Sequence, residues 1–180
     1  MFEKYTRQYI ALKSSESEMR WIYQIIEEHA EQDRVICRER SPTTGFAVVM
    51  DTKWDEQNLD DLYVVALTEN RDLHTLRDLR QEHIPLLLHI REVTQKTLLE
   101  KYGVPSEDIY AFIHYIPSHM QFHIHFVHIK RQSINSFLRC HLLETVIQNL
   151  QIDPLYYTKV TLTYKLQTNH TLYTIMHSSS

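Results

Sequence analysis

The chain has 180 residues, of which 43% are hydrophobic and 23% are charged, and its formal net charge is −4 at pH 7. This length and apolar content suit one compact core and are too small for two comfortable domains. Acidic and basic residues are interspersed, so the sequence lacks the basic field that long nucleic acids recruit, and we expect any nucleic-acid ligand to be short.

Signals for membranes, secretion and glycine loops are missing from the sequence. No apolar run approaches the roughly 18 to 20 residues that span a bilayer, and the N-terminal MFEKYTRQYIALK lacks a secretory apolar region. The cysteines, Cys37 and Cys140, form no metal-like cluster, which favours reduced thiols. Two glycines cannot build a glycine-rich phosphate loop. We therefore expect a soluble intracellular protein with no membrane partner.

The first predicted elements are one helix and three strands. Serines at 14–17 can cap an amphipathic helix over 18–33, in which apolar residues recur at helical spacing. The runs VICRE and FAVVM flank the turn SPTTG and predict a β-hairpin or two linked strands. The run LYVVALT predicts a further strand from Leu62.

A long helix is predicted from near Glu82 to Tyr102, where Gly103 stops it. IYAFIHY and FHIHFVHIK predict two strands, FLRCHLLETVIQNL a last amphipathic helix and YTKVTLTYKL a last strand. This order indicates an α+β fold with a mainly antiparallel sheet. We divide the chain into a polar lead-in over 1–17, a single domain over 18–170 and a flexible tail over 171–180.

Five of the twelve histidines lie between His114 and His128. Because side chains alternate along a strand, two sets of residues are expected on opposite faces. The polar face would hold His119, Gln121, His123 and His125, and the core face Phe122, Ile124 and Phe126. An unprotonated imidazole can attack phosphorus while a second ring or a hydroxyl steadies the departing charge. Two other interpretations stay open: a zinc site without an obvious acidic or thiol ligand nearby, and a merely solvated strand face.

The segment HYIPSHMQFHIHF resembles the active-site strand of the histidine-triad family, specifically of the scavenger mRNA decapping enzymes, which carry a His-Tyr-x-Pro-Ser lead-in. The resemblance runs from about Trp21 to Lys165 and includes KWDEQNLDDLYVVAL, SPTTGF and the LRDL at 76–79. It implies a histidine-triad fold with a long helix and a C-terminal helix, paired as a homodimer, with no metal or other cofactor.

The resemblance also implies roles for individual residues. His123 corresponds to the histidine that attacks phosphorus and forms a covalent nucleotidyl intermediate, which water then hydrolyses. His125, His114 and Ser118 correspond to residues around the phosphates, and Arg139 to a basic phosphate contact.

Two positions of the histidine segment depart from the family pattern. Gln121 stands where the first triad histidine is usual, and glutamine cannot become cationic. If that position only braces the strand, activity survives. His119 replaces an aromatic residue and would supply some of the missing positive charge beside the phosphates.

The resemblance implies a cap-binding set in the first third of the chain. Trp21 would stack on 7-methylguanine, Glu31 and Asp51 would accept hydrogen bonds from the base edge or ribose, and Lys53 would donate to the base carbonyl. Ten residues of straight helix span about 15 Å, so the predicted helix must end or bend before Glu31, or a second subunit must help. Thr52 replaces a larger apolar residue and should weaken the stack. Taken singly, these residues also fit ordinary core and surface roles.

The implied activity is cleavage of the triphosphate bridge of a 7-methylguanosine cap dinucleotide or short capped RNA, with release of m7GMP in the cytoplasm or nucleus. Twenty residues precede Trp21, whereas the decapping enzymes carry a further N-terminal domain, so the chain is either a minimal form or a fragment. Two alternatives remain: a cap-binding module that has lost catalysis, and a broader hydrolase of dinucleoside polyphosphates or nucleoside phosphoramidates.

Overall fold

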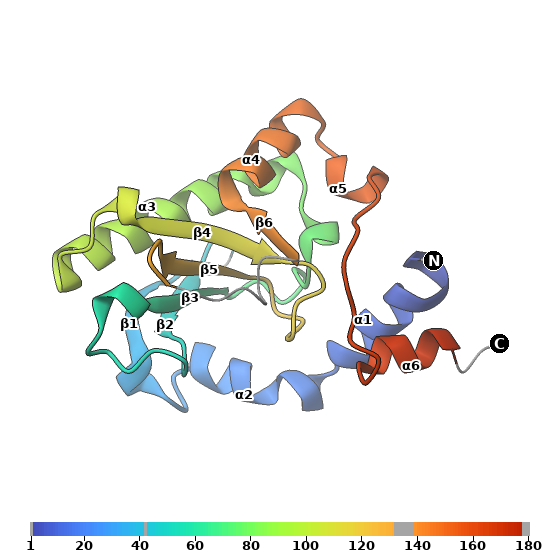
Figure 1. Cartoon of the computed structure of the whole chain (residues 1–180), viewed down its shortest axis with the longest axis horizontal. Coiled ribbons are helices and arrows are strands. Elements are labelled where there is room, and N and C mark those ends of the chain that lie inside the picture. Colours follow the sequence, from blue (N-terminus) through green and yellow to red (C-terminus); the bar gives the residue numbers. More distant parts are fainter. Residues whose placement is uncertain (1, 42, 132–138, 178–180) are drawn as a thin grey trace.

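The computed structural model describes residues 2–41, 43–131 and 139–177 (Figure 1). Within these ranges six strands form one antiparallel sheet in the order β1-β2-β3-β5-β4-β6, which confirms the predicted α+β class. The strands are β1 (Val35–Glu39), β2 (Phe46–Met50), β3 (Tyr63–Thr68), β4 (Ile109–His114), β5 (His123–His128) and β6 (Cys140–Leu142). The first five lie where the sequence predicts strands, in the runs VICRE, FAVVM, LYVVALT, IYAFIHY and FHIHFVHIK.

Helices cover both faces of the sheet. They are α1 (Arg7–Lys13), α2 (Glu16–Ile26), α3 (Ile84–Tyr102), α4 (Leu143–Ile152), α5 (Tyr156–Lys159) and α6 (Thr171–His177). Helices α3 and α4 lie on one face, and α2 lies across the other (Figure 1). No helix in the described ranges is long and apolar enough to cross a bilayer.

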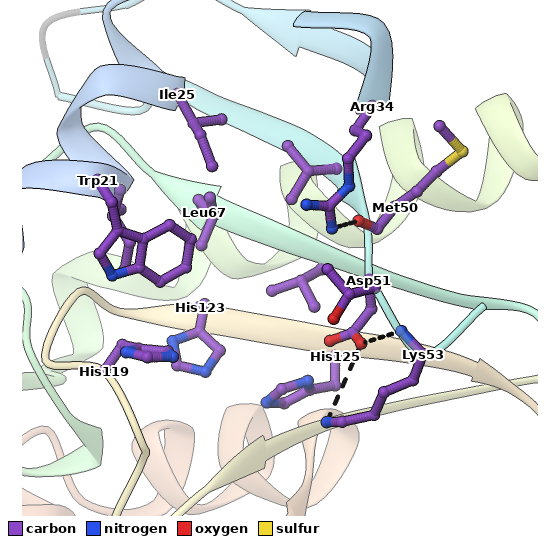
Figure 2. A pocket seen from close by; sticks show the side chains of 14 residues that line it. Trp21, Ile25, Arg34, Met50, Asp51, Lys53, Leu67, His119, His123 and His125 are labelled. Atoms are coloured by element: carbon purple, nitrogen blue, oxygen red, sulfur yellow. Dashed lines mark hydrogen bonds and ion pairs between the residues drawn. The ribbon is translucent and has the colours of Figure 1, made fainter. Parts of the chain in front are cut away.

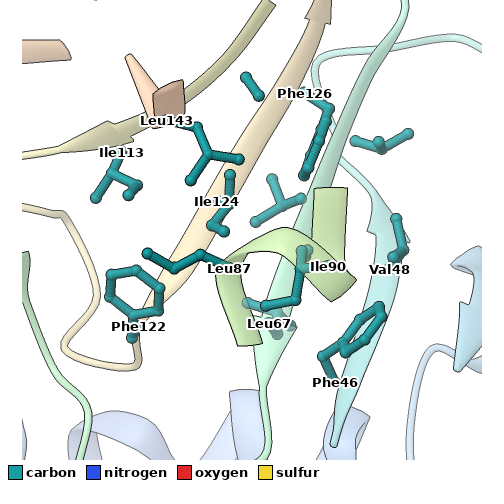
Figure 3. Close-up of a cluster of buried hydrophobic side chains, with 14 of the residues drawn as sticks. Phe46, Val48, Leu67, Leu87, Ile90, Ile113, Phe122, Ile124, Phe126 and Leu143 are labelled. Atoms are coloured by element: carbon teal, nitrogen blue, oxygen red, sulfur yellow. The ribbon is translucent and has the colours of Figure 1, made fainter. Parts of the chain in front are cut away.

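The main core lies between the sheet and α3. Ile124 and Phe126 of β5 are fully buried and point toward Leu87 and Ile90 of α3 (Figure 3). The alternate residues of β5 therefore face α2, which is where the predicted histidine row belongs. The long predicted helix is confirmed, and Gly103 ends it in the left-handed conformation with φ 68°.

Helix α2 ends at Ile26, so the predicted continuation to Asp33 is wrong. The guanidinium of Arg38, on the neighbouring strand β1, donates to the carbonyl oxygens of Ile26 at 2.7 Å and Ile25 at 3.0 Å. A cation at a helix C-terminus satisfies its last carbonyls and complements the helix dipole. Glu28, two residues after Ile26, has φ 66° and turns the chain away from the helix.

Two predictions in the last third of the chain are also wrong. The predicted helix FLRCHLLETVIQNL begins as strand β6, which pairs with the open edge of β4, and turns helical only at Leu143; Phe137 and Leu138 lie outside the described residues. The predicted strand YTKVTLTYKL begins inside α5 and then runs on without helix or strand over 161–167. Arg77 of the LRDL motif holds this segment by donating to the carbonyls of Tyr157 at 2.8 Å and Val160 at 2.7 Å.

The two ends of the chain pack together (Figure 1). Tyr9 of α1 is buried, within the predicted polar lead-in, and its ring lies 5.4 Å from that of His170. Where a flexible tail was predicted over 171–180, helix α6 occupies Thr171–His177 and buries Leu172 completely, because the N-terminal helices offer it an apolar surface.

Gly103 provides a test of the α3 C-terminus. A Cβ at this position would meet no atom within 4 Å, so the cost of a substitution comes from the positive φ alone. Gly103→Ala should lower the free energy of unfolding by about 1 kcal/mol, measured by urea unfolding. Gly103→Asn should lose less, because asparagine tolerates the left-handed region. An alanine variant as stable as the parent would contradict this account.

Candidate active site

Strand β5 presents His123 and His125 to the α2 face of the sheet. They pair across to Leu67 and Val65 of β3, and their ring centroids lie 4.8 Å apart. The two histidines are 7% and 6% exposed. A solvated strand face is therefore excluded for this pair, although the predicted alternation of faces is confirmed along β5.

Gln121 lies before the strand and is fully buried, so the predicted four-residue polar row does not form one continuous strand face. Its side-chain amide donates to the carbonyls of Thr68 and Asn70, both at 2.8 Å. These bonds fasten the loop that enters β5 to the end of β3. At the position of the missing triad histidine, glutamine thus has the geometry of a brace.

The tautomer of His123 follows from its hydrogen bond. Nδ1 lies 2.6 Å from the backbone carbonyl oxygen of Gln121. A carbonyl can only accept, so Nδ1 carries the proton and Nε2 carries a lone pair. Burial lowers the pKa of His123 from its ordinary 6.5 to about 4, which keeps the ring neutral near pH 7. His123 therefore has the protonation state of a nucleophile.

His125 lies among aromatic partners behind His123. Its Nδ1 is 2.9 Å from the hydroxyl of Tyr63, and its ring stacks on Phe112 with centroids 5.1 Å apart. The ring of His114, at the end of β4, lies 4.4 Å away. Burial, and after it the neighbouring His123 and His114, hold the pKa of His125 well below its ordinary range. The ring of His125 thus lies against that of His123, and the ring of His114 lies against that of His125.

A pocket of about 290 Å³ opens between α2 and the sheet (Figure 2). Its lining comprises Trp21, Ile22, Ile25, Arg34, Val49, Met50, Asp51, Thr52, Lys53, Val65, Leu67, His119, His123 and His125. The structure thus brings together three of the four predicted cap-binding residues and the predicted nucleophile. Residues separated by about a hundred positions in the sequence meet here.

Trp21 and His119 form one wall of this pocket (Figure 2). Their rings meet edge to face, with centroids 4.9 Å apart and planes at 79°. Trp21 is 43% exposed, so it is not the core residue that a simple amphipathic helix would predict. Burial lowers the pKa of His119, followed in effect by the charge of Lys53, so this ring also tends to the neutral form.

The opposite wall is polar. Asp51 accepts a hydrogen bond from the backbone nitrogen of Lys53 at 2.9 Å, and the Lys53 ammonium lies 4.0 Å from the Asp51 carboxylate. Glu31 does not line the pocket; it pairs with Arg34, which does, and Arg34 in turn donates to the Met50 carbonyl. The sequence analysis did not predict Arg34 as a pocket residue. Its position three residues after Glu31 could have indicated an ion pair between them.

Ser118 and Arg139 do not line the histidine pocket, although both were predicted beside the phosphates. They line a neighbouring pocket of about 580 Å³, where Arg139 donates to the Ile116 carbonyl at 3.2 Å.

Regarding the zinc interpretation, no group of three histidine, cysteine, aspartate or glutamate side chains suited to a metal ion occurs in the part of the chain that the structure describes.

Comparison with known proteins identifies the family. The profile of the family described as "Scavenger mRNA decapping enzyme C-term binding" matches residues 20–141, a range that contains every predicted site residue. The chain is 37% identical to the m7GpppX diphosphatase of Rattus norvegicus and 36% identical to that of Homo sapiens, each over 169 residues. Both alignments cover 93% of this chain and 50% of the relative, so the chain spans about half the length of these curated relatives.

A solved structure of Hnt3 in complex with DNA and guanosine is a more distant neighbour. It has a TM-score of 0.43 and 16% identity, and the match covers 72% of this chain and 75% of that chain. The assignment therefore rests on the sequence matches, which agree with the resemblance of the histidine segment. The chain belongs to the family of the scavenger mRNA decapping enzymes, within the part described as their C-terminal binding region.

Proposed function

We propose that the chain hydrolyses the triphosphate bridge of a 7-methylguanosine cap dinucleotide or short capped RNA and releases m7GMP. The observation that carries this proposal is the neutral, oriented imidazole of His123 in the same pocket as Trp21. The relatives named m7GpppX diphosphatase support it.

The proposed reaction has two displacements at one phosphorus. Nε2 of His123 attacks the phosphorus next to the methylguanosine, and the bond from that phosphorus to the bridging oxygen breaks. A nucleoside diphosphate leaves with the electron pair, and the methylguanylate is held on nitrogen. Water then attacks the same phosphorus, the P–N bond breaks, and the electron pair returns to Nε2 as the water proton is released. The Gln121 carbonyl stabilises the positive charge that the attacking ring gains.

The rest of the pocket fits the methylated base. N7-methylation gives guanine a delocalised positive charge, which favours an aromatic face such as Trp21 and a nearby carboxylate such as Asp51. A volume of about 290 Å³ suits a base and little more. Glu31 would act at the rim through Arg34. By the family resemblance we extend the proposal to a homodimer that acts in the cytoplasm or nucleus.

His123→Asn tests the nucleophile. Turnover of m7GpppG should fall by about 10³-fold or more, because no lone pair remains to attack phosphorus, while the Kd for m7GMP stays within about threefold. Products are separated by ion-exchange chromatography. His177→Asn, on the exposed face of α6, is the matched control and should keep full activity. A folded His123 variant that retains turnover would refute the mechanism, and a parent chain that binds without turnover would favour the binding-module alternative.

The lowered pKa of His123 predicts a pH dependence of stability. Between pH 6.5 and about 4, His123 becomes protonated in the unfolded state but stays neutral in the folded state. The free energy of unfolding should therefore fall as pH falls through this window. In His123→Asn the difference between pH 7 and pH 5, measured by urea unfolding, should be smaller than in the parent. Equal differences in the two proteins would show that His123 titrates normally.

Trp21→Ala tests base recognition. Stacking on an aromatic side chain contributes about 1–3 kcal/mol per base, so the Kd for m7GMP should rise by roughly 5- to 150-fold in a calorimetric titration. Trp21→Phe should recover part of the affinity. The preference for m7GMP over GMP should shrink together with the affinity, since the cationic base gains most from the ring. A preserved preference in Trp21→Ala would place methyl recognition elsewhere.

A further inference from the structure

A second pocket, of about 580 Å³, lies where the two ends of the chain meet. Its lining comprises Tyr9, Lys13, Ser118, Arg139, Lys165, Leu166, Gln167, His170 and Thr171. Helix α1, the lead-in to β5 and the segment before α6 thus contribute to one cavity. Neither the base pocket nor the proposed chemistry at His123 uses the α1 and C-terminal residues of this set.

The lining of this second pocket is strongly cationic. Lys13, Arg139 and Lys165 are basic, and none of the nine described lining residues is an aspartate or glutamate. Lys13 pairs with Glu18 at 3.0 Å, and Glu18 lies outside the lining. In a chain of net charge −4, three cations around one cavity form a local field for an anion.

The second pocket adjoins the histidine pocket. Ser118 lines the second pocket and His119, the next residue, lines the first. Cations of the second pocket also act on histidines of the first. Burial is the largest cause of the lowered pKa of His119 and of His125, and the charges of Lys13 and Arg139, respectively, add to it. The two pockets thus meet at Ser118 and His119, and a polyphosphate attacked at His123 would extend toward this boundary.

We propose that the second pocket binds the leaving half of the substrate, a nucleoside 5′-diphosphate or the 5′-diphosphate end of a short RNA. This inference rests on the proposed function of the histidine pocket. Two phosphates carry up to three negative charges, which match Lys13, Arg139 and Lys165. The Ser118 hydroxyl and the Gln167 amide add neutral donors. The volume, twice that of the base pocket, leaves room for a nucleoside.

The test is a binding measurement that does not depend on turnover. UDP is titrated into protein saturated with m7GMP, so that the base pocket is already filled, and binding is followed by calorimetry. Lys13→Ala/Lys165→Ala should weaken UDP binding by roughly 10-fold or more and flatten its salt dependence, while the Kd for m7GMP changes less than about twofold. Lys96→Ala, an exposed lysine on α3 across the sheet, is the matched control and should change neither.

The outcomes separate this inference from the proposed function. UDP binding that the double variant loses supports the second pocket even if the parent shows no turnover. Equal UDP affinity in parent and double variant, or equal weakening of UDP and m7GMP, overturns the inference while leaving the base pocket intact. If the loss of the Lys13 contact with Glu18 unfolds α1, Lys165→Glu alone applies the same test, because Lys165 is exposed and its charge reversal should repel UDP.

Discussion

The hydrogen bond from His123 Nδ1 to the Gln121 carbonyl is the contact on which the site depends. The position of this carbonyl depends on the loop before β5, and several hydrogen bonds restrain that loop. The Gln121 amide binds two carbonyls at the end of β3, and Phe122 exchanges backbone bonds with Thr68 and Leu73. A side chain that donates two bonds to the backbone restrains this loop without any charge. The departure from the triad therefore preserves the orientation of the ring, although it removes a titratable group.

A second restraint sets the position of the base relative to His123. Helix α2 carries Trp21, and the cation of Arg38 holds the helix C-terminus against β1. Arg38 also approaches Glu28 at 3.3 Å, and Arg40 pairs with Glu69 at 2.7 Å across to the end of β3. The strand end that anchors Gln121 thus also anchors the termination of α2. One end of β3 therefore helps to locate both Trp21 and His123, which explains how residues so distant in sequence keep a common geometry.

The predictable parts of the molecule are those that local pattern determines. Continuous apolar runs specify β2 and β3, alternation specifies β5, and Gly103 specifies the end of α3, because these preferences act within a few residues. The end of α2 could not be predicted, since Arg38 that terminates it follows twelve residues later. Strand β6 could not be predicted either, because it forms by pairing with the open edge of β4, which lies far from it in the sequence. In the site, the structure gathers Trp21, Asp51 and His119 into one pocket with His123, as spacing and family resemblance grouped them. The separation of Ser118 from the histidine pocket depends on how the chain ends fold back.

The separation of the two pockets resolves a conflict in the chemistry. A phosphate ligand is held best by cations, but a cation directly beside His123 would oppose the positive charge that its ring gains when it attacks phosphorus. The histidine pocket keeps its imidazoles neutral by burial, and its one lysine, Lys53, is drawn toward Asp51. The cations Lys13 and Arg139 lie in the neighbouring pocket, where their field still depresses histidine protonation. In the proposed reaction the departing diphosphate gains negative charge as the bond breaks, so cations placed on its side favour the products of the first step more than the bound substrate. Positive charge is thus located where negative charge develops, and the lone pair of His123 stays available.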